Sequence, residues 1–418
     1  MEGLNQALLS DNKKSMQAST QSRIEVIDVL RGFTLIGIAI IHFAEQFYAG
    51  AHPQSHSNFN IKFLGDEIVM GFIGILISGK FFMIFSFLFG LSFSIQLNKS
   101  KGDLPFVLRF FWRLFILLLI GLIHHLHYRG DILTIYAMLG VGLLLCFRLP
   151  DKVLIILALV LTLNLPSVVV RGWQATQQPA TSVEAMFAGA DADNERYYNT
   201  VKSGQYKDVL VANFHELDYK YQFQVDSGRI YITMGLFLLG LYAGRKRFFE
   251  NLELNLPYVK KILLKRSLWI MLALIIAALI FFGGAELLKL QLPEIVQWTV
   301  GGLLFDGFNL VLASIYVAAI ILLFEKKRWH KLLMTLYAPG RMGLTTYLVQ
   351  GLAGTTLFFG FGFGLLGEVG VLVSVGFGLL LFILQAYFSS WWLGRFKYGP
   401  AEWLWRSLTY LKVQPLRN

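Results

Sequence analysis

The sequence predicts an all-α membrane protein, a polytopic bundle of about ten transmembrane helices with one large extracytoplasmic connection. Two features predict this fold class. Hydrophobic residues make up 56% of the chain and charged residues only 15%, whereas a soluble domain carries about 25% charged residues. Long apolar runs recur along the chain, and lysines and arginines gather at their ends. The net charge of +11 is therefore typical of membrane boundaries, and no nucleic-acid partner is expected.

Ten apolar runs are long enough to cross about 30 Å of hydrocarbon, and together they predict a single transmembrane bundle over 23–411. The run 66–77 is shorter and predicts an interfacial or re-entrant piece before the second span. The one cysteine, Cys146, excludes an intrachain disulfide. In chain order, the ten predicted spans lie near 27–48, 79–97, 108–127, 131–148, 153–170, 229–244, 267–284, 298–324, 341–361 and 369–393.

The distribution of positive charge predicts the orientation. Cytoplasmic connections carry an excess of lysine and arginine, and both tails of this chain, 1–22 and 412–418, also carry lysine or arginine. Both are therefore expected to be cytoplasmic, the first as a flexible tail. The long connection 171–228 is expected outside, where Tyr206 to Val225 could form an amphipathic helix; a surface cover with no chemistry is an equal alternative. The basic connections lie at 99–113, 148–152, 245–266 and 326–331.

The first apolar run carries charge at both ends. Asp28 and Arg31 lie near its start, and His42 and Glu45 near its end. Ionisable groups are costly at bilayer depth, so they usually face a bundle interior or a wet cavity. At about 100° per residue, Arg31 and His42 fall within roughly 20° of each other around a helix. This polar face is where function is expected.

Four further ionisable side chains mark other spans. Lys80 opens the second span, where snorkelling to the interface is the alternative. Asp306 lies inside the eighth span and is costly there unless it is paired or caps a helix. Arg341 opens the ninth span, and Glu402 near the C-terminus stands among tryptophans that are typical of a membrane interface.

Three histidines and Asp131 surround the short turn after the third span. One interpretation of His124, His125 and His127 with this carboxylate is a metal site. Their spacing matches no standard set of ligands, and no metal is expected. His124 and Asp131 are candidates for handling protons or binding substrate, because histidine titrates near neutral pH. His125 and His127 fit a polar helix end that meets water.

Five blocks carry a resemblance to a known family: IDVLRGF, GKFFMIFSFLFGLSF, the GLIH…GDIL…YA block, GRMGLTTYLVQ and YGPAEWLWRSLTY. Together they resemble the YeiB-like family of bacterial membrane proteins, in family order from Ile27 to Tyr410. That family is poorly defined in function and is loosely described as transport-related. It is also distantly similar to the membrane acyltransferase superfamily, which includes heparan-α-glucosaminide acetyltransferase and bacterial sugar O-acetyltransferases. The latter carry an arginine and a histidine in the first helix at a separation like that of Arg31 and His42.

The superfamily resemblance implies an enzyme of the bacterial inner membrane that takes acyl-CoA from the cytoplasm and acylates a sugar or other small-molecule acceptor on the far side. It implies His42 as a base or transient acyl carrier and Glu45 as the residue that orients its ring. Arg31, with Lys80 and Arg341, would bind acyl-CoA. In one respect the chain departs from many YeiB-like relatives, which have asparagine at the position of His42.

A transporter or proton-coupled exporter is the rival from another class. In that reading Asp28, Arg31, Asp131 and Asp306 are relay or substrate groups across the bundle. A non-catalytic scaffold whose buried charges set the helix register is a third. Membrane lipid surrounds the protein in every case. The acyl donor, the acceptor and the formation of a homo-oligomer are left open by the sequence.

Overall fold

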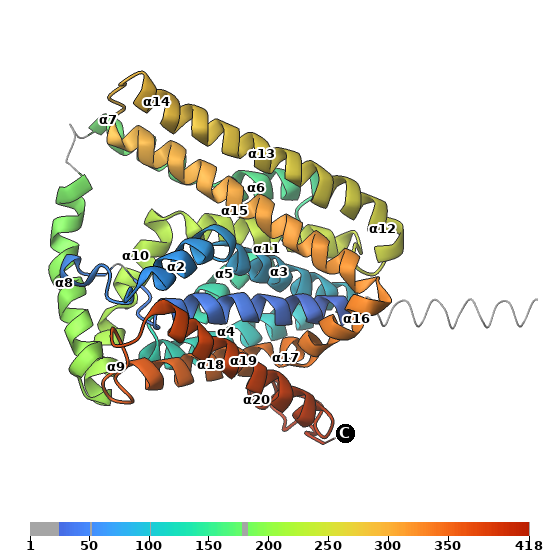
Figure 1. The fold of residues 1–418 in the computed structure, drawn as a ribbon. Helices are drawn as coiled ribbons and strands as arrows, with labels where there is room; N and C mark the ends of the chain where they lie inside the picture. The colour runs from blue at the N-terminus through green and yellow to red at the C-terminus, as the bar shows by residue number, and fades with distance from the viewer. Residues whose placement is uncertain (1–24, 51, 101, 178–182, 418) are drawn as a thin grey trace, which may run out of the picture.

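The computed structural model describes residues 25–50, 52–100, 102–177 and 183–417, and within these ranges the chain folds as helices packed side by side, with no strand (Figure 1). Among the described residues, six helices are long and apolar enough to cross a membrane. The predicted all-α membrane bundle is therefore confirmed. The predicted flexible tail, 1–22, lies outside the described residues.

Five helices form the centre of the bundle. The first helix is Glu25–Ala44, and a turn and a short 3-10 helix, η1 (Gln54–His56), follow it. The others are α3 (Lys80–Ser100), α4 (Leu104–His127), α5 (Leu133–Cys146) and α11 (Arg229–Arg245). Their facing sides are apolar, and leucine, isoleucine and phenylalanine side chains from all of them are buried.

Helices α3 and α11 approach so closely that only glycine fits at the crossing. A Cβ at Gly90 of α3 would lie 2.0 Å from the carbonyl oxygen of Phe237, and one at Gly240 of α11 would lie 2.1 Å from that of Phe87. Small residues let membrane helices pack backbone against backbone, which is a main source of helix association in lipid.

A long antiparallel hairpin lies along one side of the bundle, at the top of Figure 1. One arm comprises α12 (Leu252–Tyr258), η2 (Val259–Arg266), α13 (Ser267–Ala278), η3 (Leu279–Gly283) and α14 (Gly284–Leu287), and the other is α15 (Glu294–Phe324). Large apolar side chains on α13 are exposed, among them Trp269 and Ile270. Such a surface fits lipid, since burying it in hydrocarbon is favourable.

The predicted span 153–170 is two helices. α6 (Asp151–Thr162) ends before Asn164, whose φ of 57° is left-handed, and α7 (Leu165–Gln177) continues after it. The long connection then contains α8 (Val183–Ser203), α9 (Tyr206–His215) and α10 (Leu217–Asp226). The amphipathic helix expected from Tyr206 to Val225 is thus divided in two at Glu216.

The C-terminal third closes the bundle. It contains α16 (Lys327–Leu333), η4 (Met334–Leu336), α17 (Tyr337–Arg341), α18 (Gly343–Phe358), α19 (Val371–Leu393) and α20 (Pro400–Tyr410). The first helix lies against α17, since a Cβ at Gly340 would meet the carbonyl oxygen of Asp28 at 1.8 Å. Residues of the predicted C-terminal tail fold back, and the Lys397 amide donates to the Leu416 carbonyl over 2.9 Å.

Ten spans were expected, and each predicted run coincides with a helix or a broken pair of helices. The six long ones are the first helix, α2 (Leu64–Leu76) joined to α3, α4, the two arms of the hairpin and α19. The other four correspond to shorter helices, namely α5, α6 with α7, α11 and α18. The predicted interfacial piece 66–77 is α2, which runs into α3 through a tight turn at Gly79.

Candidate functional site

A cavity of about 720 Å³ lies inside the bundle. Arg31 and His42 of the first helix and Glu45 directly after it all line this cavity, so the polar face expected from the sequence borders one internal space. Fourteen residues separate Arg31 from Glu45, which is roughly 21 Å along a helix. The cavity therefore extends over most of the length of the bundle core. The other walls come from α3, α4, α5, α10, α11, α17, α18 and α20.

One end of this cavity, here called the arginine end, is defined by Arg31, Arg113 and Arg341. Arg31 pairs with Asp28 and donates to Ser92 Oγ over 2.6 Å. The guanidinium of Arg113 donates to Gln96 Oε1 over 2.7 Å.

A second cavity of about 290 Å³ shares these three arginines and adds further positive and aromatic groups. Lys397 and Arg406 join the lining, while Asp28 and Glu402 are its only carboxylates among the described residues. The Arg113 guanidinium lies 4.0 Å from the ring centroid of Trp405, and that of Arg406 lies 4.9 Å from Tyr398. Five cations against two carboxylates make this end suited to an anion.

Glu402 has a structural role here. Its carboxylate accepts hydrogen bonds from the amides of Leu344 and Thr345, over 2.7 and 3.0 Å, and from Thr345 Oγ1 over 2.6 Å. These groups belong to the first turn of α18, so the side chain caps that helix from α20. The tryptophans beside Glu402 predict that this segment lies at the membrane interface. The carboxylate of Glu402 itself points inward, toward α18.

The middle of the cavity is apolar. Its walls are phenylalanine, leucine and isoleucine side chains from the first helix, α3, α4 and α5, so a ligand that reached from one end to the other would need an apolar or weakly polar central part. This section is lined by Ile38, Phe81, Phe85, Leu88, Phe89, Leu114, Leu117 and Leu133.

His42 lies in an aromatic pocket beyond that apolar section. Its ring centroid is 5.2 Å from Tyr128, 5.5 Å from Phe47 and 6.3 Å from Tyr347. Glu45 follows three residues later and lines the same wall. Arg229, at the start of α11, also lines this part of the cavity and interacts electrostatically with Glu45.

The opposite end, here called the lid end, is roofed by α10 and lined by Glu45, Arg129, Asp131, Glu216, Lys220, Gln224 and Arg229. Two ion pairs fasten α10 to the turn between α4 and α5. Glu216 Oε2 lies 3.0 Å from Arg129 Nη1, and Lys220 Nζ lies 3.4 Å from Asp131 Oδ2.

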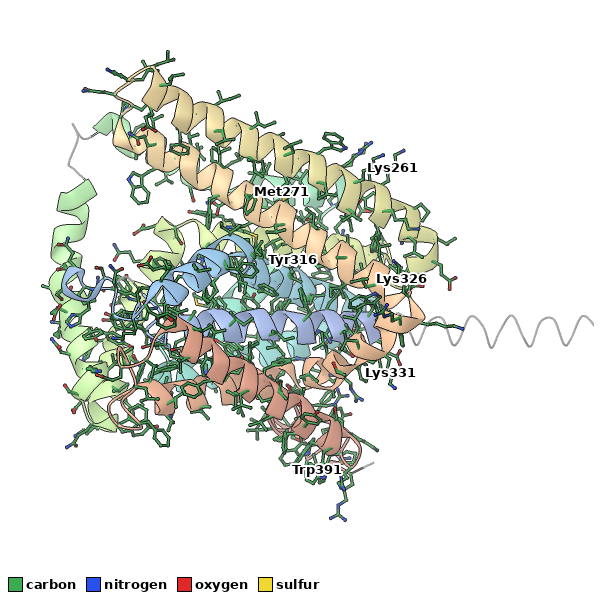
Figure 2. The ribbon with its side chains drawn as sticks, in the orientation of Figure 1. Lys261, Met271, Tyr316, Lys326, Lys331 and Trp391 are labelled. Carbon is green, nitrogen blue, oxygen red and sulfur yellow. The ribbon has the colours of Figure 1, made fainter. Side chains whose placement is uncertain are left out.

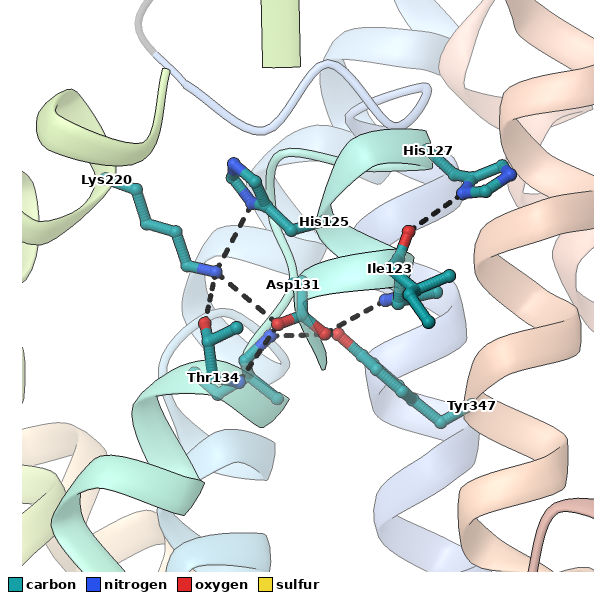
Figure 3. Close-up of polar contacts among 9 residues, drawn as sticks. Ile123, His125, His127, Asp131, Thr134, Lys220 and Tyr347 are labelled. Carbon is teal, nitrogen blue, oxygen red and sulfur yellow. Dashed lines mark hydrogen bonds and ion pairs between the residues drawn. The ribbon is translucent and has the colours of Figure 1, made fainter. Parts of the chain in front are cut away.

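Lys220 reaches from α10 into a buried polar cluster, which Figure 3 shows. Its ammonium donates to Thr134 Oγ1 over 2.6 Å and lies 3.4 Å from His125 Nδ1. The other nitrogen of that imidazole lies 2.8 Å from the Asn213 carbonyl, so Nε2 carries the proton and Nδ1 accepts. Burial lowers the pKa of Lys220, and the Asp131 carboxylate opposes this shift.

The structure brings His124 and Asp131 into contact. His124 Nδ1 lies 2.9 Å from Asp131 Oδ1, and Asp131 Oδ2 also accepts from the Thr134 amide over 3.0 Å. His124 itself does not line the cavity. Its Nε2 is buried without a hydrogen-bond partner, facing Gly351 of α18, where a Cβ would lie 2.2 Å away.

Two further predicted site residues lie away from both cavity linings. The buried ammonium of Lys80 donates to the carbonyls of Ser78 and Gly74, over 2.7 and 3.2 Å, at the C-terminal end of α2. Asp306 Oδ2 accepts from Asn164 Nδ2 over 3.0 Å, which ties α15 to the break between α6 and α7. Within the described ranges, no three histidine, cysteine or acidic side chains are grouped to hold a metal ion.

Several lining residues were not singled out from the sequence. The sequence places Arg113 among the boundary charges and gives no site role to Arg129, Lys220, Gln224 or Arg406, which line the two cavities. The spacing of Arg109 and Arg113, one helical turn apart at the start of an apolar run, was the one available sign of a basic face.

Comparison with known proteins relates the chain to a family of unknown function and to several uncharacterized proteins. Residues 243–412 match the family described as "Protein of unknown function (DUF418)". The chain is 31% identical to uncharacterized protein YxaH of Bacillus subtilis, over 95% of this chain and 96% of that protein. It is 25% identical to an uncharacterized 39.9 kDa protein of Bacillus acidopullulyticus, over 94% and 96% of the two chains.

A shorter match joins the chain to uncharacterized protein YeiB of Escherichia coli, at 40% identity over 85 residues, which is 20% of this chain and 22% of YeiB. No solved structure matches the chain significantly.

Proposed function

The chain belongs to the YeiB-like family, together with YxaH, and from this premise we propose that it is a membrane-embedded acyltransferase. In this proposal an acyl group moves from cytoplasmic acyl-CoA to a small-molecule acceptor on the other side of the membrane. The observation that carries the proposal is the single cavity that has an arginine end, an apolar middle and a histidine in its far half.

The arginine end suits the phosphates of CoA. Guanidinium groups form short, charge-assisted hydrogen bonds to phosphate oxygens, often two at a time. Arg31, Arg113 and Arg341 border both cavities at this end, and Arg406 borders the smaller one. The aromatic rings of Trp405 and Tyr398 offer faces on which an adenine could stack. The proposal therefore puts the nucleotide of CoA here.

The apolar middle then accommodates the arm that carries the thioester. His42 lies eleven residues beyond Arg31, which is about 16 Å along the helix. A thioester at the end of an extended arm would arrive beside the His42 ring.

His42 is the proposed general base. A neutral imidazole accepts the proton of an acceptor hydroxyl while the hydroxyl oxygen attacks the thioester carbonyl carbon. The carbon–sulfur bond then breaks, and the CoA thiol leaves with the proton that His42 returns. Transient transfer of the acyl group to His42 itself is the two-step alternative. Glu45, one turn further along, is proposed to orient the ring.

The experiment that tests this function is release of free CoA thiol by the purified protein. Acetyl-CoA and longer acyl-CoA thioesters are supplied as donors in detergent or in vesicles, and labelled acyl product is followed alongside thiol. Binding of CoA is measured separately by thermal stabilisation, because a ligand that binds the folded state raises the melting temperature by an amount that grows with the logarithm of its concentration relative to its Kd. A protein that neither binds CoA nor cleaves any of these thioesters contradicts the proposal.

Transport of a small molecule is the second candidate, and the length of the cavity favours it. A continuous space of roughly 21 Å, with a roof fastened by ion pairs, also fits a path across the bilayer. The same assay separates the two functions. A transporter moves a labelled solute into vesicles and leaves thioesters intact.

A further inference from the structure

Two tyrosines stand beside His42 in the wall of the large cavity. Tyr128 directly follows α4, and Tyr347 belongs to α18. The centroids of their rings lie 5.2 and 6.3 Å from that of the His42 imidazole, and all three residues line the same space. A ligand group that contacts His42 is therefore close to two phenolic hydroxyls from different elements.

The hydroxyl of Tyr347 has its oxygen bonded and its proton free. The side chain points toward the turn that carries Asp131 (Figure 3), and the Ile132 amide donates to Tyr347 Oη over 3.1 Å. Because the amide supplies the proton of this bond, and no acceptor within the described ranges takes the phenolic proton, that proton remains available to a ligand. Hydrogen bonds in a chain polarise one another, so the amide makes this hydroxyl a stronger donor.

The hydroxyl of Tyr128 is open to the cavity. The residue is only 1% exposed, yet its hydroxyl makes no hydrogen bond to any residue that the structure describes. It is also absent from the buried polar atoms that are closed off without a partner. Since Tyr128 lines the cavity, its hydroxyl contacts that space and can donate there.

These two donors carry no charge, and the charged groups nearby balance each other. Glu45 and Arg229 line the same part of the cavity and attract one another. An ion that carries full charge in its ground state therefore gains little here. A carbonyl oxygen that becomes negative only during a reaction is a better fit, because neutral donors aimed at it bind the charged form more strongly than the neutral form.

The proposed acyl transfer produces such an oxygen. When the acceptor oxygen attacks the thioester carbonyl carbon and loses its proton to His42, the C=O electron pair moves to the carbonyl oxygen. The pair returns when the carbon–sulfur bond breaks, and the CoA thiol leaves with the proton from His42. The hydrogen bond from acceptor to base and the distance of attack are each about 3 Å, so the carbonyl lies within about 6 Å of the imidazole, where the two tyrosines stand.

We propose that Tyr128 and Tyr347 form the oxyanion hole of this protein, each donating a hydrogen bond to the thioester carbonyl oxygen as it becomes negative. The inference rests on the proposed function and adds to it the two groups that stabilise the tetrahedral intermediate. It gives these tyrosines contact with a reacting atom, which a role in packing does not require.

Infrared spectroscopy of a bound carbonyl tests this contact without catalysis. The probe is an acetyl-CoA analogue with a methylene group in place of the thioester sulfur and an isotope label on the carbonyl carbon, so no transfer can occur. Donors aimed at the oxygen weaken the C=O bond and lower its stretching frequency. The bound analogue is expected to absorb at a lower frequency than in water, whereas an apolar wall without donors would raise the frequency.

Tyr347→Phe and Tyr128→Phe are each expected to return part of that shift, and the double variant all of it. In the assay of thiol release, Tyr347→Phe should lower kcat about 10²–10³-fold, the usual effect of removing one oxyanion-hole donor. KM for acetyl-CoA should change little, because the ground-state carbonyl is neutral. If Tyr347→Phe does not fold, the wild-type frequency and the Tyr128 variant still decide.

Tyr316→Phe is the matched control. It also removes a hydrogen-bonded hydroxyl inside the bundle, one that donates to the Leu76 carbonyl over 2.8 Å, but this tyrosine lies outside both cavity linings. Its carbonyl frequency and kcat should equal those of the wild type. A change in melting temperature alone would report on packing and leave the frequency unaltered.

A wild-type frequency at or above the value in water would overturn the oxyanion hole, and so would an unchanged frequency in the double variant. These results differ from failure of the proposed function. Wild-type protein that neither binds the analogue nor releases thiol contradicts acyl transfer, and the oxyanion hole is rejected with it. Thiol release with the same kcat in both tyrosine variants retains acyl transfer and removes this role.

Discussion

At the scale of single residues, Arg31 and His42 have different proposed roles because they lie at different positions along the first helix. Arg31 and His42 share a face of the first helix, yet Arg31 contacts Asp28 and Ser92 at the arginine end, whereas His42 lies among Tyr128, Phe47 and Tyr347. Arg31 is proposed to bind the negative charge of CoA, and His42 is proposed to transfer the proton. Substitutions at the two positions should therefore change different kinetic constants.

His42→Ala is expected to lower kcat for acyl transfer about 10²–10⁴-fold, the usual effect of losing a positioned general base, with KM for acyl-CoA little changed. Steady-state kinetics of the purified variant measure both constants. His127→Ala is the control, since this imidazole bonds to the Ile123 carbonyl and Tyr206 outside the cavity lining. Full activity of the His42 variant would remove this residue from the mechanism.

Arg113→Gln is expected to weaken CoA binding by about tenfold to a hundredfold, because a hydrogen bond between charged groups contributes more than a neutral one. Titration calorimetry or thermal stabilisation by CoA measures the loss. Lys261→Gln at the same end of the bundle, but outside both cavity linings, removes one positive charge as a control. An equal loss in both variants would indicate a nonspecific effect of net charge.

At the scale of elements, short helices at the two ends of the cavity hold it in shape. At the arginine end, α20 supplies Glu402 to the first turn of α18. At the lid end, α10 covers the opening and is fastened by Glu216 and Lys220, which are one helical turn apart. Each contact joins segments far apart in the sequence, so each contributes to stability only after the bundle has assembled.

Glu402→Ala is expected to destabilise the protein by roughly 2 kcal/mol, because three donors in the first turn of α18 lose their acceptor. The melting temperature in detergent should fall by several degrees. Glu402→Gln keeps an amide oxygen for these donors and should recover part of the loss. An unchanged melting temperature in the alanine variant would show that water or a neighbouring group replaces the cap.

Lys220→Met is expected to loosen α10. It leaves the Asp131 carboxylate with its other partners but removes the buried cation, and breaking one partner of such a pair costs about 3–5 kcal/mol. The readout is labelling by N-ethylmaleimide of a cysteine introduced by Ala49→Cys, in the cavity lining, in a Cys146→Ser background. This labelling should become faster, since α10 opens more often. Lys207→Met on the exposed side of α9 is the matched control. Equal labelling rates in the two variants would show that the ion pairs do not hold the roof.

At the scale of the whole molecule, positive charge and the long connection lie at opposite ends of the bundle. Figure 2 places Lys261, Lys326 and Lys331 at the end where the first helix begins, while α8, α9 and α10 lie at the other end in Figure 1. The arginine end of the cavity is on the side of the lysines, because Arg31 lies in the second turn of the first helix. If the protein is oriented by the positive-inside rule, the arginine end of the cavity faces the cytoplasm.

Cysteine labelling in intact cells tests this orientation. In the Cys146→Ser background, Ser203→Cys should react with a membrane-impermeant maleimide without lysis, whereas Lys261→Cys should react only after the cells are opened. Both positions are exposed, so accessibility to the reagent depends on the side of the membrane. The reverse pattern would contradict cytoplasmic CoA binding at the arginine end.

The sequence by itself determined the class of the protein and much of its outline. Apolar runs of sufficient length locate the helices, since the backbone must satisfy its own hydrogen bonds in lipid. The periodicity of the first run placed Arg31, His42 and Glu45 on one face, and these three residues line one cavity. Both inferences depend on local pattern, and local pattern is what a sequence displays directly.

Only the tertiary structure decided which charges meet. It brings Arg129 and Lys220 to carboxylates from distant segments, and it buries Lys80 against the carbonyls of α2 rather than in the cavity. It also divides the predicted outer helix at Glu216, and the second half, α10, lines the lid end of the cavity. A charged residue at the end of an apolar run looks the same whether it faces water, lipid or a partner, because its partner is chosen by the packing of helices remote in the sequence.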